Sequence, residues 1–201
     1  LNKLNNPSGA VKAFEKAISL RPDSAEFHNN IGLAYVKLGE LGLAKKGFES
    51  AIRNNPKIAE IFNNYGNALL ENGEINAARD SFLRAIQIAP SFIDALWNLS
   101  GTVTTIDEHI SLLEDCLQID QGYKKAKLML SSMNAYLGDP GELNTVLETS
   151  LRNHPYIRSA SWLIDLKNRP AVYFNRWQFY DSVSKLSQPS RPFYEFGVWR
   201  G

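Results

Sequence analysis

Side-chain amides recur at a fixed interval in the first half of the chain. Asn30, Asn64 and Asn98 are spaced 34 residues apart, and Asn29 and Asn63 directly precede the first two. A primary amide offers one hydrogen-bond acceptor and two donors. It can therefore bind both the C=O and the N–H of an extended peptide backbone without reading the peptide's sequence. The amides predict a peptide-binding surface, but paired asparagines can also bond neighbouring helices together, and the sequence leaves both interpretations open.

The other residues that could carry chemistry are isolated. His28, His109 and His154 are far apart and lack the spacing of metal ligands, and Cys116 is the single cysteine. We interpret His28 as a packing residue, and His109 and His154 as helix-end or loop residues. Cys116 stands where alanines stand in earlier parts of the chain, which predicts a buried, inert thiol. We therefore predict no catalytic residue and no metal site.

The elements that must position the amides follow the same 34-residue interval. The interval recurs in four further series: Pro22, Pro56 and Pro90; Phe14, Phe48 and Phe82; Ala10, Ala44 and Ala78; Ala17, Ala51 and Ala85. Self-similarity at this period predicts stacked helix–turn–helix units. Gly39 and Gly73 would end the first helices, because glycine adopts a positive φ angle at low cost. The predicted helices cover 25–38 and 59–72 as first helices, and 41–54 and 75–89 as second helices.

This combination of residues resembles the tetratricopeptide repeat (TPR). In the unit that starts at Ala25 the family pattern falls on Ile31, Gly32, Tyr35, Ala44, Phe48, Ala51 and Pro56. In the next unit it falls on Tyr65, Gly66, Leu69, Ala78, Phe82, Ala85 and Pro90. The resemblance implies an all-α fold, a right-handed TPR superhelix. Gly32 and Gly66 would let paired helices approach closely, and the phenylalanines would fill the space between pairs.

The repeat pattern divides the chain into segments. Residues 1–155 are predicted to hold a partial repeat at 1–22 and repeats at 25–58, 59–92, 93–123 and 124–157. The repeat at 93–123 is three residues short, most simply in its first helix or the following turn. Asp107 is predicted to be the N-cap of its second helix. Residues 156–188 are predicted to form capping or linker helices, and 189–201 a short non-helical tail.

The resemblance also implies a binding groove, because the first helices of a TPR solenoid line its concave face. The residues predicted to bind a peptide there are Asn29, Asn30, Asn63, Asn64, Asn67, Trp97 and Asn98. The row formed by Asn30, Asn64 and Asn98 is similar to the asparagine ladder of O-linked N-acetylglucosamine transferases. Trp97 either anchors a ligand side chain or packs across the shortened repeat.

One class of peptide ligand is not expected. TPR domains that hold chaperone C-termini use a lysine at the fifth position of the repeat as part of a carboxylate clamp. Here that position carries Asn29, Asn63, Trp97 and Leu128. An acidic C-terminal tail is therefore not the predicted ligand.

The last nine residues resemble a different family. Residues 193–201 resemble the first motif of class I S-adenosylmethionine-dependent methyltransferases, in which a glycine loop lets the backbone approach the cofactor. The resemblance implies that Glu195, Gly197 and Gly201 are cofactor-loop positions of a full-length enzyme. One strand cannot form a parallel sheet, so we expect no cofactor binding and no catalysis by this chain. Its first residue, Leu1, and its abrupt end predict a fragment of a longer protein.

Composition narrows the classes of partner. The 201 residues are 44% hydrophobic and 21% charged, which is enough apolar material for a packed core. The net charge of +1 argues against a nucleic-acid or membrane-surface binder. The sequence contains no run of 18 apolar residues, so no transmembrane helix is predicted. The single cysteine and the absence of a signal-peptide pattern at the first residues predict a cytoplasmic protein.

The sequence as a whole predicts an interaction scaffold that binds an extended peptide or a partner protein in the concave TPR groove. One alternative is the N-terminal, substrate-presenting part of a methyltransferase whose catalytic domain is missing here. Another is self-association through the exposed ends of the solenoid, since each repeat relies on its neighbours for burial.

Overall fold

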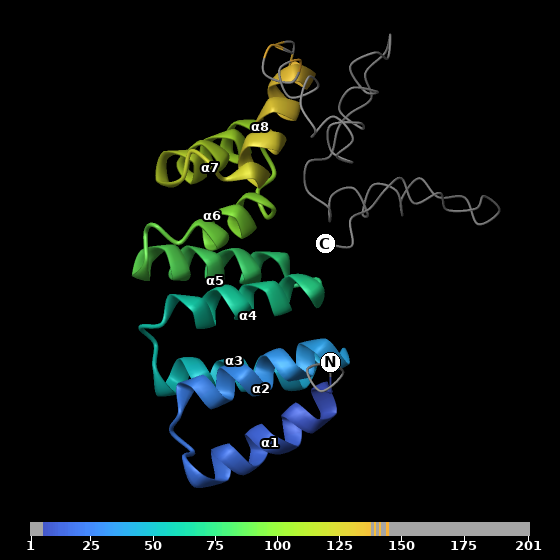
Figure 1. The fold of residues 1–201 in the computed structure, drawn as a ribbon, viewed down its shortest axis with the longest axis vertical. Coiled ribbons are helices and arrows are strands. Elements are labelled where there is room, and N and C mark those ends of the chain that lie inside the picture. The colour runs from blue at the N-terminus through green and yellow to red at the C-terminus, as the bar shows by residue number, and fades with distance from the viewer. Residues whose placement is uncertain (1–5, 138, 140, 142–143, 145–201) are drawn as a thin grey trace, which may run out of the picture. The chain divides into compact units, whose positions relative to one another are not determined.

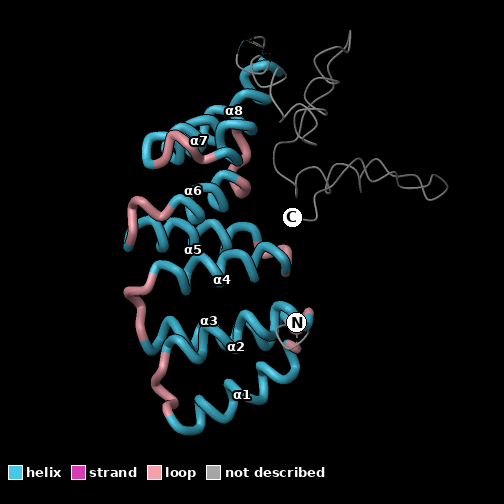
Figure 2. Tube along the Cα trace, viewed as in Figure 1, coloured by secondary structure: helices cyan, strands magenta, loops and turns pink. Residues whose placement is uncertain are grey.

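The computed structural model describes residues 6–137, 139, 141 and 144, which consist mainly of α-helices joined by short turns (Figures 1 and 2). The helices are α1 (Pro7–Leu20), α2 (Ala25–Leu38), α3 (Leu41–Asn54), α4 (Ala59–Glu71), α5 (Ile75–Ile88), α6 (Ile93–Ser100), α7 (Ile106–Ile119) and α8 (Lys124–Leu137). No strand occurs among the described residues, and the predicted all-α fold is confirmed. The capping helices predicted at 156–188 and the tail at 189–201 lie outside the described residues.

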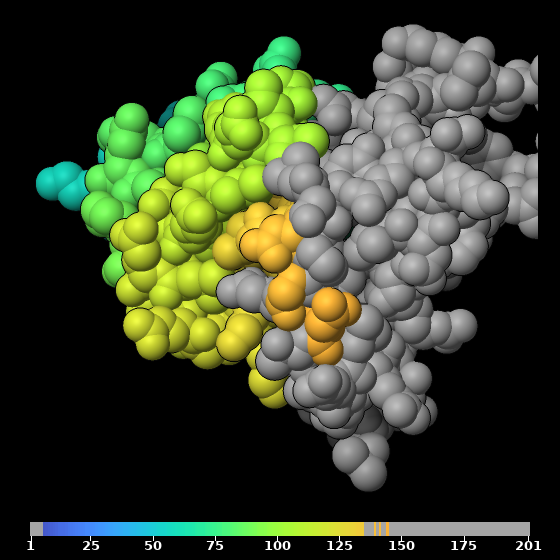
Figure 3. All heavy atoms as spheres, turned by 90° about the horizontal axis from the view of Figure 1, so that it is seen from above, coloured from blue at the N-terminus to red at the C-terminus, as the bar shows by residue number. Residues whose placement is uncertain are grey.

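The chain divides into two compact units, Leu1–Thr102 and Val103–Gly201. The first unit contains α1–α6, and each of these helices packs against the next one in the chain (Figure 1). The second unit contains α7 and α8, whose atoms lie against each other in the space-filling view, coloured yellow-green to orange (Figure 3). The division falls within the segment predicted as the repeat at 93–123.

The helix ends follow local chemistry. Gly39 and Gly73 have φ angles of 77° and 79° just after α2 and α4, as predicted for residues that end first helices. The Ser24 hydroxyl accepts a hydrogen bond from the backbone N–H of Phe27 at the start of α2. The N-cap of α7 is Thr105, whose hydroxyl accepts from the backbone N–H of Glu108 at 3.3 Å. The prediction of Asp107 as N-cap was wrong, because the β-region backbone that a cap needs lies two residues earlier.

The helix ranges predicted from the sequence agree with the structure to within one residue, and the first helix of the short repeat is shorter than the other first helices. The bounds of α2 and α3 are as predicted, and α4 and α5 each end one residue earlier. The first helix of the short repeat, α6, has only 8 residues, whereas α2 has 14. The missing length therefore lies in the first helix, which is one of the two places that the sequence allowed.

The repeated glycine and phenylalanine residues form the seams within the helix pairs. Phe48 and Phe82 are fully buried, as are the alanines of the same series: Ala44, Ala51, Ala78 and Ala85. A Cβ atom added to Gly32 would lie 2.9 Å from Cε1 of Phe48, and one added to Gly66 would lie 2.5 Å from Cε1 of Phe82. The prediction that these glycines allow close approach of paired helices is confirmed.

Candidate functional site

The residues predicted to bind a peptide lie on one layer of helices. The first helices α2, α4 and α6 contact one another in a row, in addition to their contacts with second helices. The second helices α3 and α5 are not packed closely against each other in this unit. A stack of helix pairs in which one layer is closer together curves toward that layer. The first helices therefore form the inner layer of the first unit.

Amide–amide hydrogen bonds join the helices of this inner layer. Asn64 Nδ2 donates to Asn29 Oδ1 at 3.1 Å between α4 and α2, and Asn98 Nδ2 donates to Asn63 Oδ1 at 2.9 Å between α6 and α4. Asn29 and Asn63 are buried, with 6% and 7% of their surface exposed. These two residues therefore bond neighbouring first helices together, which is the alternative that the sequence left open for paired asparagines.

The second asparagine of each pair has a different environment. Asn30, Asn64 and Asn98 are half-buried, as is Asn67 one turn beyond Asn64. Asn30 Oδ1 accepts from Asn29 Nδ2 at 3.4 Å. Within the described residues, Asn64 and Asn98 each use one N–H in the bond to the preceding first helix. The remaining N–H and the carbonyl oxygen of each amide make no hydrogen bond in the described part of the chain, so they are available to a ligand.

Trp97 is the aromatic member of the predicted site and lies in the short helix α6. It is half-buried and directly precedes Asn98. Partial exposure is compatible with both interpretations of this residue, as a ligand anchor and as a packing residue of the shortened repeat. Its role stays a prediction.

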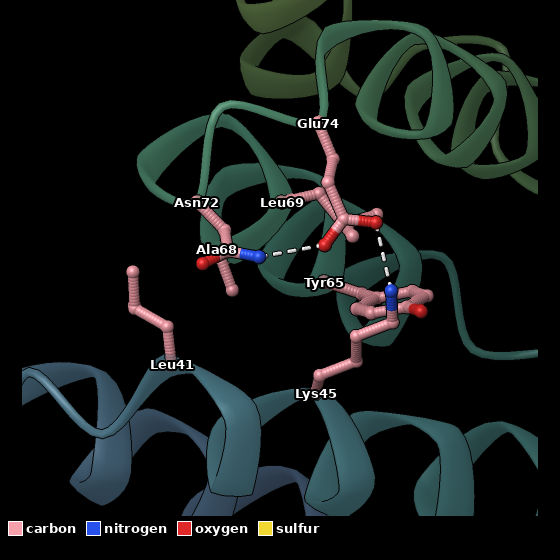
Figure 4. Close-up of a pocket in the computed structure, with 7 residues that line it drawn as sticks. All are labelled: Leu41, Lys45, Tyr65, Ala68, Leu69, Asn72 and Glu74. Carbon is pink, nitrogen blue, oxygen red and sulfur yellow. Dashed lines mark hydrogen bonds and ion pairs between the residues drawn. The ribbon is translucent and has the colours of Figure 1, made fainter.

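A small polar cluster lies between α3 and the turn from α4 to α5 (Figure 4). Lys45 Nζ lies 2.7 Å from Glu74 Oε2, and Asn72 Nδ2 donates to Glu74 Oε1 at 2.7 Å. The hydrogen bond from Lys45 is the main reason that the pKa of Glu74 lies below its usual value. The depression around them has an empty volume of about 160 Å³, which includes space open to solvent. The cluster joins successive helix pairs and offers no enclosed ligand site.

Replacing Lys45 with methionine tests the strength of this connection. The two side chains are 38% and 34% exposed, so we expect the free energy of unfolding to fall by less than about 1 kcal/mol. Urea unfolding followed by circular dichroism measures the change. The difference between the variant and the wild type should shrink at about 0.5 M NaCl, because salt screens exposed ion pairs. A loss that is large and independent of salt would contradict the interpretation of this contact as a weak, exposed ion pair.

Tyrosine–glutamate hydrogen bonds recur beside the helix seams. The Tyr65 hydroxyl donates to Glu49 Oε1 at 3.2 Å, and the Tyr35 hydroxyl donates to Glu15 Oε1 at 3.5 Å. Burial, together with the charge of Glu49, raises the pKa of Tyr65 to about 12. Both tyrosines therefore stay protonated at neutral pH and act as hydrogen-bond donors within the fold.

The two described histidines and the cysteine are buried or bonded within the fold. His28 is half-buried, and its Nε2 lies 2.8 Å from the carbonyl oxygen of Pro22. Cys116 is fully buried, as predicted. His109 lies in the first turn of α7 but is only 3% exposed, a burial that the sequence did not reveal. His154 lies outside the described residues. Among the residues that the structure describes, no group of three or more His, Cys, Asp or Glu side chains could hold a metal ion.

Four further predictions from the sequence are not tested by the structure. Glu195, Gly197 and Gly201 lie outside the described residues, so the methyltransferase-like motif and the use of S-adenosylmethionine by a full-length protein stay predictions. Self-association and a cytoplasmic location also stay predictions. Of the helices described, none has the length and apolar character needed to cross a bilayer.

Comparisons with known protein families identify the repeats. A family model described as "TPR repeat" matches residues 1–39, and one described as "Tetratricopeptide repeat" matches residues 31–91. Residues 1–91 therefore carry tetratricopeptide repeats, as the resemblance predicted. No curated protein sequence matches the chain.

Solved structures share the fold. YrrB, described as a TPR protein with an unusual peptide-binding site, is 20% identical, with a TM-score of 0.64 over 81% of this chain and 87% of that one. MamA is 22% identical, with a TM-score of 0.60 over 78% and 87%. The first TPR domain of Spaghetti (RPAP3), bound to the HSP90 peptide SRMEEVD, is 16% identical, with a TM-score of 0.53 over 58% and 94%. The chain is similar to these proteins in fold, which is that of a TPR solenoid.

Proposed function

We propose that the first unit binds an extended peptide, or an extended segment of a partner protein, along the inner layer formed by α2, α4 and α6. The proposal rests on one observation. Asn64 and Asn98 are held in place by one hydrogen bond each to the preceding first helix, and each keeps one N–H and its carbonyl oxygen available. An amide oriented in advance loses less conformational entropy when a ligand binds.

The chemistry of these groups suits a peptide backbone. The remaining N–H can donate to a backbone C=O, and the carbonyl oxygen can accept from a backbone N–H. Asn30 extends the same row onto α2, one amide per helix. Because backbone groups are the same in every residue, the row supplies affinity, and the side chains around it supply specificity. Trp97 and Asn67 lie on the same helices and are the side chains that we propose contribute to specificity.

Proteins of similar fold support a binding role without defining the ligand. YrrB is described as having a peptide-binding site, and the Spaghetti domain was solved with an HSP90 peptide. That peptide, SRMEEVD, ends in acidic residues. At the fifth repeat position, where carboxylate-binding TPR domains carry lysine, the first unit of this chain has Asn29, Asn63 and Trp97. We therefore propose a ligand held by its backbone and not by a terminal carboxylate.

The double variant Asn64→Ala with Asn98→Ala tests the proposal. We expect it to weaken binding of a peptide, selected on an array with the wild-type protein, by about tenfold or more, since several hydrogen bonds are lost. Fluorescence anisotropy with the labelled peptide measures the affinity.

Two controls separate contact from packing. Asn29→Ala with Asn63→Ala removes the same bonds between helices but leaves the half-buried amides in the groove, and should weaken binding less. Asn76→Ala changes an exposed asparagine of α5 and should have no effect. Equal losses in the two double variants would show that the amides act through helix packing, and unchanged affinity in Asn64→Ala with Asn98→Ala would overturn the proposed function.

A further inference from the structure

A row of carboxylates accompanies the amide row of the inner layer. Glu26, Glu60 and Asp94 each precede the half-buried asparagine of their helix by four residues. Residues four apart lie on the same face of an α-helix. The carboxylates and the amides therefore form two parallel rows on one face of α2, α4 and α6, and the hydrogen bonds between the helices hold the amide row in register.

Three other carboxylates of the first unit have bonding partners, whereas those of the row have none in the part of the chain that the structure describes. Glu15, Glu49 and Glu74 are bonded to a tyrosine, a tyrosine and a lysine. Within the described residues, the three carboxylates of the row are exposed and make neither a hydrogen bond nor an ion pair. The whole chain has a net charge of +1, so this negative row is a local feature and not a consequence of a generally acidic protein.

The opposite side of the amide row is less polar. Leu33, Val36 and Leu70 are half-buried and lie beyond the asparagines, toward the C-terminal ends of α2 and α4. Along α2 and α4 the inner face therefore changes from carboxylate to amide to partly aliphatic side chains. A chain that crosses the helices with its backbone on the amides has the acidic row on one side.

The distance between helices restricts the conformation of such a chain. Packed helices are separated by about 8–10 Å. One turn of a polyproline II helix contains three residues and advances about 9 Å. A peptide in this conformation would place equivalent side chains, one in every three, at successive first helices.

We infer that the peptide bound by the inner layer is basic, with Lys or Arg at every third residue facing Glu26, Glu60 and Asp94, and that its conformation is of the polyproline II type. The inference rests on the proposed function and adds the chemical class of the ligand. Its support is charge complementarity to three unpaired carboxylates in a row whose spacing is that of the helices. The helix dipole also favours acidic residues near helix N-termini, as at the N-caps Glu40 of α3 and Glu74 of α5, but the carboxylates of the row are the ones that stand beside the amides.

Three labelled peptides test the inference with the whole chain. The first is a capped Arg-Pro-Ala repeat of four units, the second has Gln in place of Arg, and the third has the composition of the first with its arginines grouped together. We expect the first peptide to bind about tenfold more tightly than the other two at low salt, since three exposed ion pairs form. Fluorescence anisotropy measures each affinity.

The triple variant Glu26→Gln, Glu60→Gln, Asp94→Asn should remove this preference. Its matched control is Glu40→Gln, Asp80→Asn, Glu114→Gln, which makes the same change in net charge at exposed positions outside the row and should leave the preference intact. Equal binding of the Arg and Gln peptides, or an equal effect of the two triple variants, would overturn the basic ligand. Equal binding of the grouped peptide would overturn the three-residue spacing.

The same experiment distinguishes failure of the proposed function from failure of the inferred basic ligand. If the Arg and Gln peptides bind equally and Asn64→Ala with Asn98→Ala weakens both, the amide row binds backbone and the inferred basic ligand is wrong. If the acidic triple variant weakens binding and the asparagine variant does not, the charge preference holds and the amide clamp is wrong. If neither peptide binds, the basic ligand is overturned, and the array-selected peptide alone decides the proposed function.

Discussion

Replacing Gly66 with alanine is expected to lower the free energy of unfolding by about 1–3 kcal/mol, the usual cost of adding a methyl group to a filled core. The added Cβ would lie 2.5 Å from Cε1 and 2.8 Å from both Cδ1 and Cζ of Phe82. These distances are far shorter than ordinary van der Waals contacts. The ring is fully buried, so it cannot move away without opening the seam between α4 and α5.

Alanine substitutions at two other glycines serve as comparisons for this prediction. In Gly32→Ala the new Cβ would lie 2.9–3.1 Å from the ring of Phe48, so the loss should be smaller than at Gly66. Gly42 lies in α3, and nothing lies within 4 Å of an added Cβ there. Gly42→Ala should raise stability by about 0.5–1 kcal/mol, because alanine favours the helix over the unfolded chain. Urea unfolding followed by circular dichroism measures all three, and a stable Gly66→Ala protein would refute the tight seam.

Acid is expected to destabilise the second unit through His109. Burial lowers the pKa of His109 to about 4 from its ordinary value of 6.5. The unfolded chain therefore takes up a proton at a pH where the folded chain does not. The stability that the neutral imidazole contributes to the fold is complete above about pH 6.5 and is lost as the pH falls toward 4. For this pair of pKa values the loss between pH 7 and pH 5 is about 2 kcal/mol.

His109→Gln removes the titration and should flatten the dependence of unfolding free energy on pH between 7 and 5. The relevant quantity is the change with pH within each protein, since the substitution also alters packing in α7. Ser111→Ala is the matched control, because it changes an exposed residue of the same helix that carries no titrating group, and it should keep the pH dependence of the wild type. If wild type and His109→Gln lose the same free energy on acidification, His109 is not the acid-sensitive group.

Much of the first unit could be predicted from its repeat. The 34-residue interval gave the helix pairs, and the ends at Gly39 and Gly73 followed from the positive φ angle that glycine tolerates. Gly32 and Gly66 could be assigned to close contacts because they fall on the small-residue positions of the tetratricopeptide repeat that the sequence resembles. Local propensity and period carry this information, so it is present in the sequence without any tertiary contact.

Other contacts had no signal in the sequence. Gly47 follows no glycine series, yet an added Cβ would lie 3.0 Å from the Cα of Gly32, so it is part of the α2–α3 seam. The pairing of Lys45 with Glu74 joins residues on different helix pairs. The burial of His109 likewise depends on how α7 packs and not on its place near a helix end.

The asparagines show most clearly what could not be predicted from the sequence. By itself the sequence determined that amides recur once per repeat on first helices, because that follows from a fixed interval and the helical period. It could not determine which amide of each pair is buried. The tertiary structure decided this, since Asn29 and Asn63 accept hydrogen bonds from the next first helix and only packed neighbours can supply those donors. A hydrogen bond between repeats depends on distances across the seam, and those distances exist only when the helices are stacked.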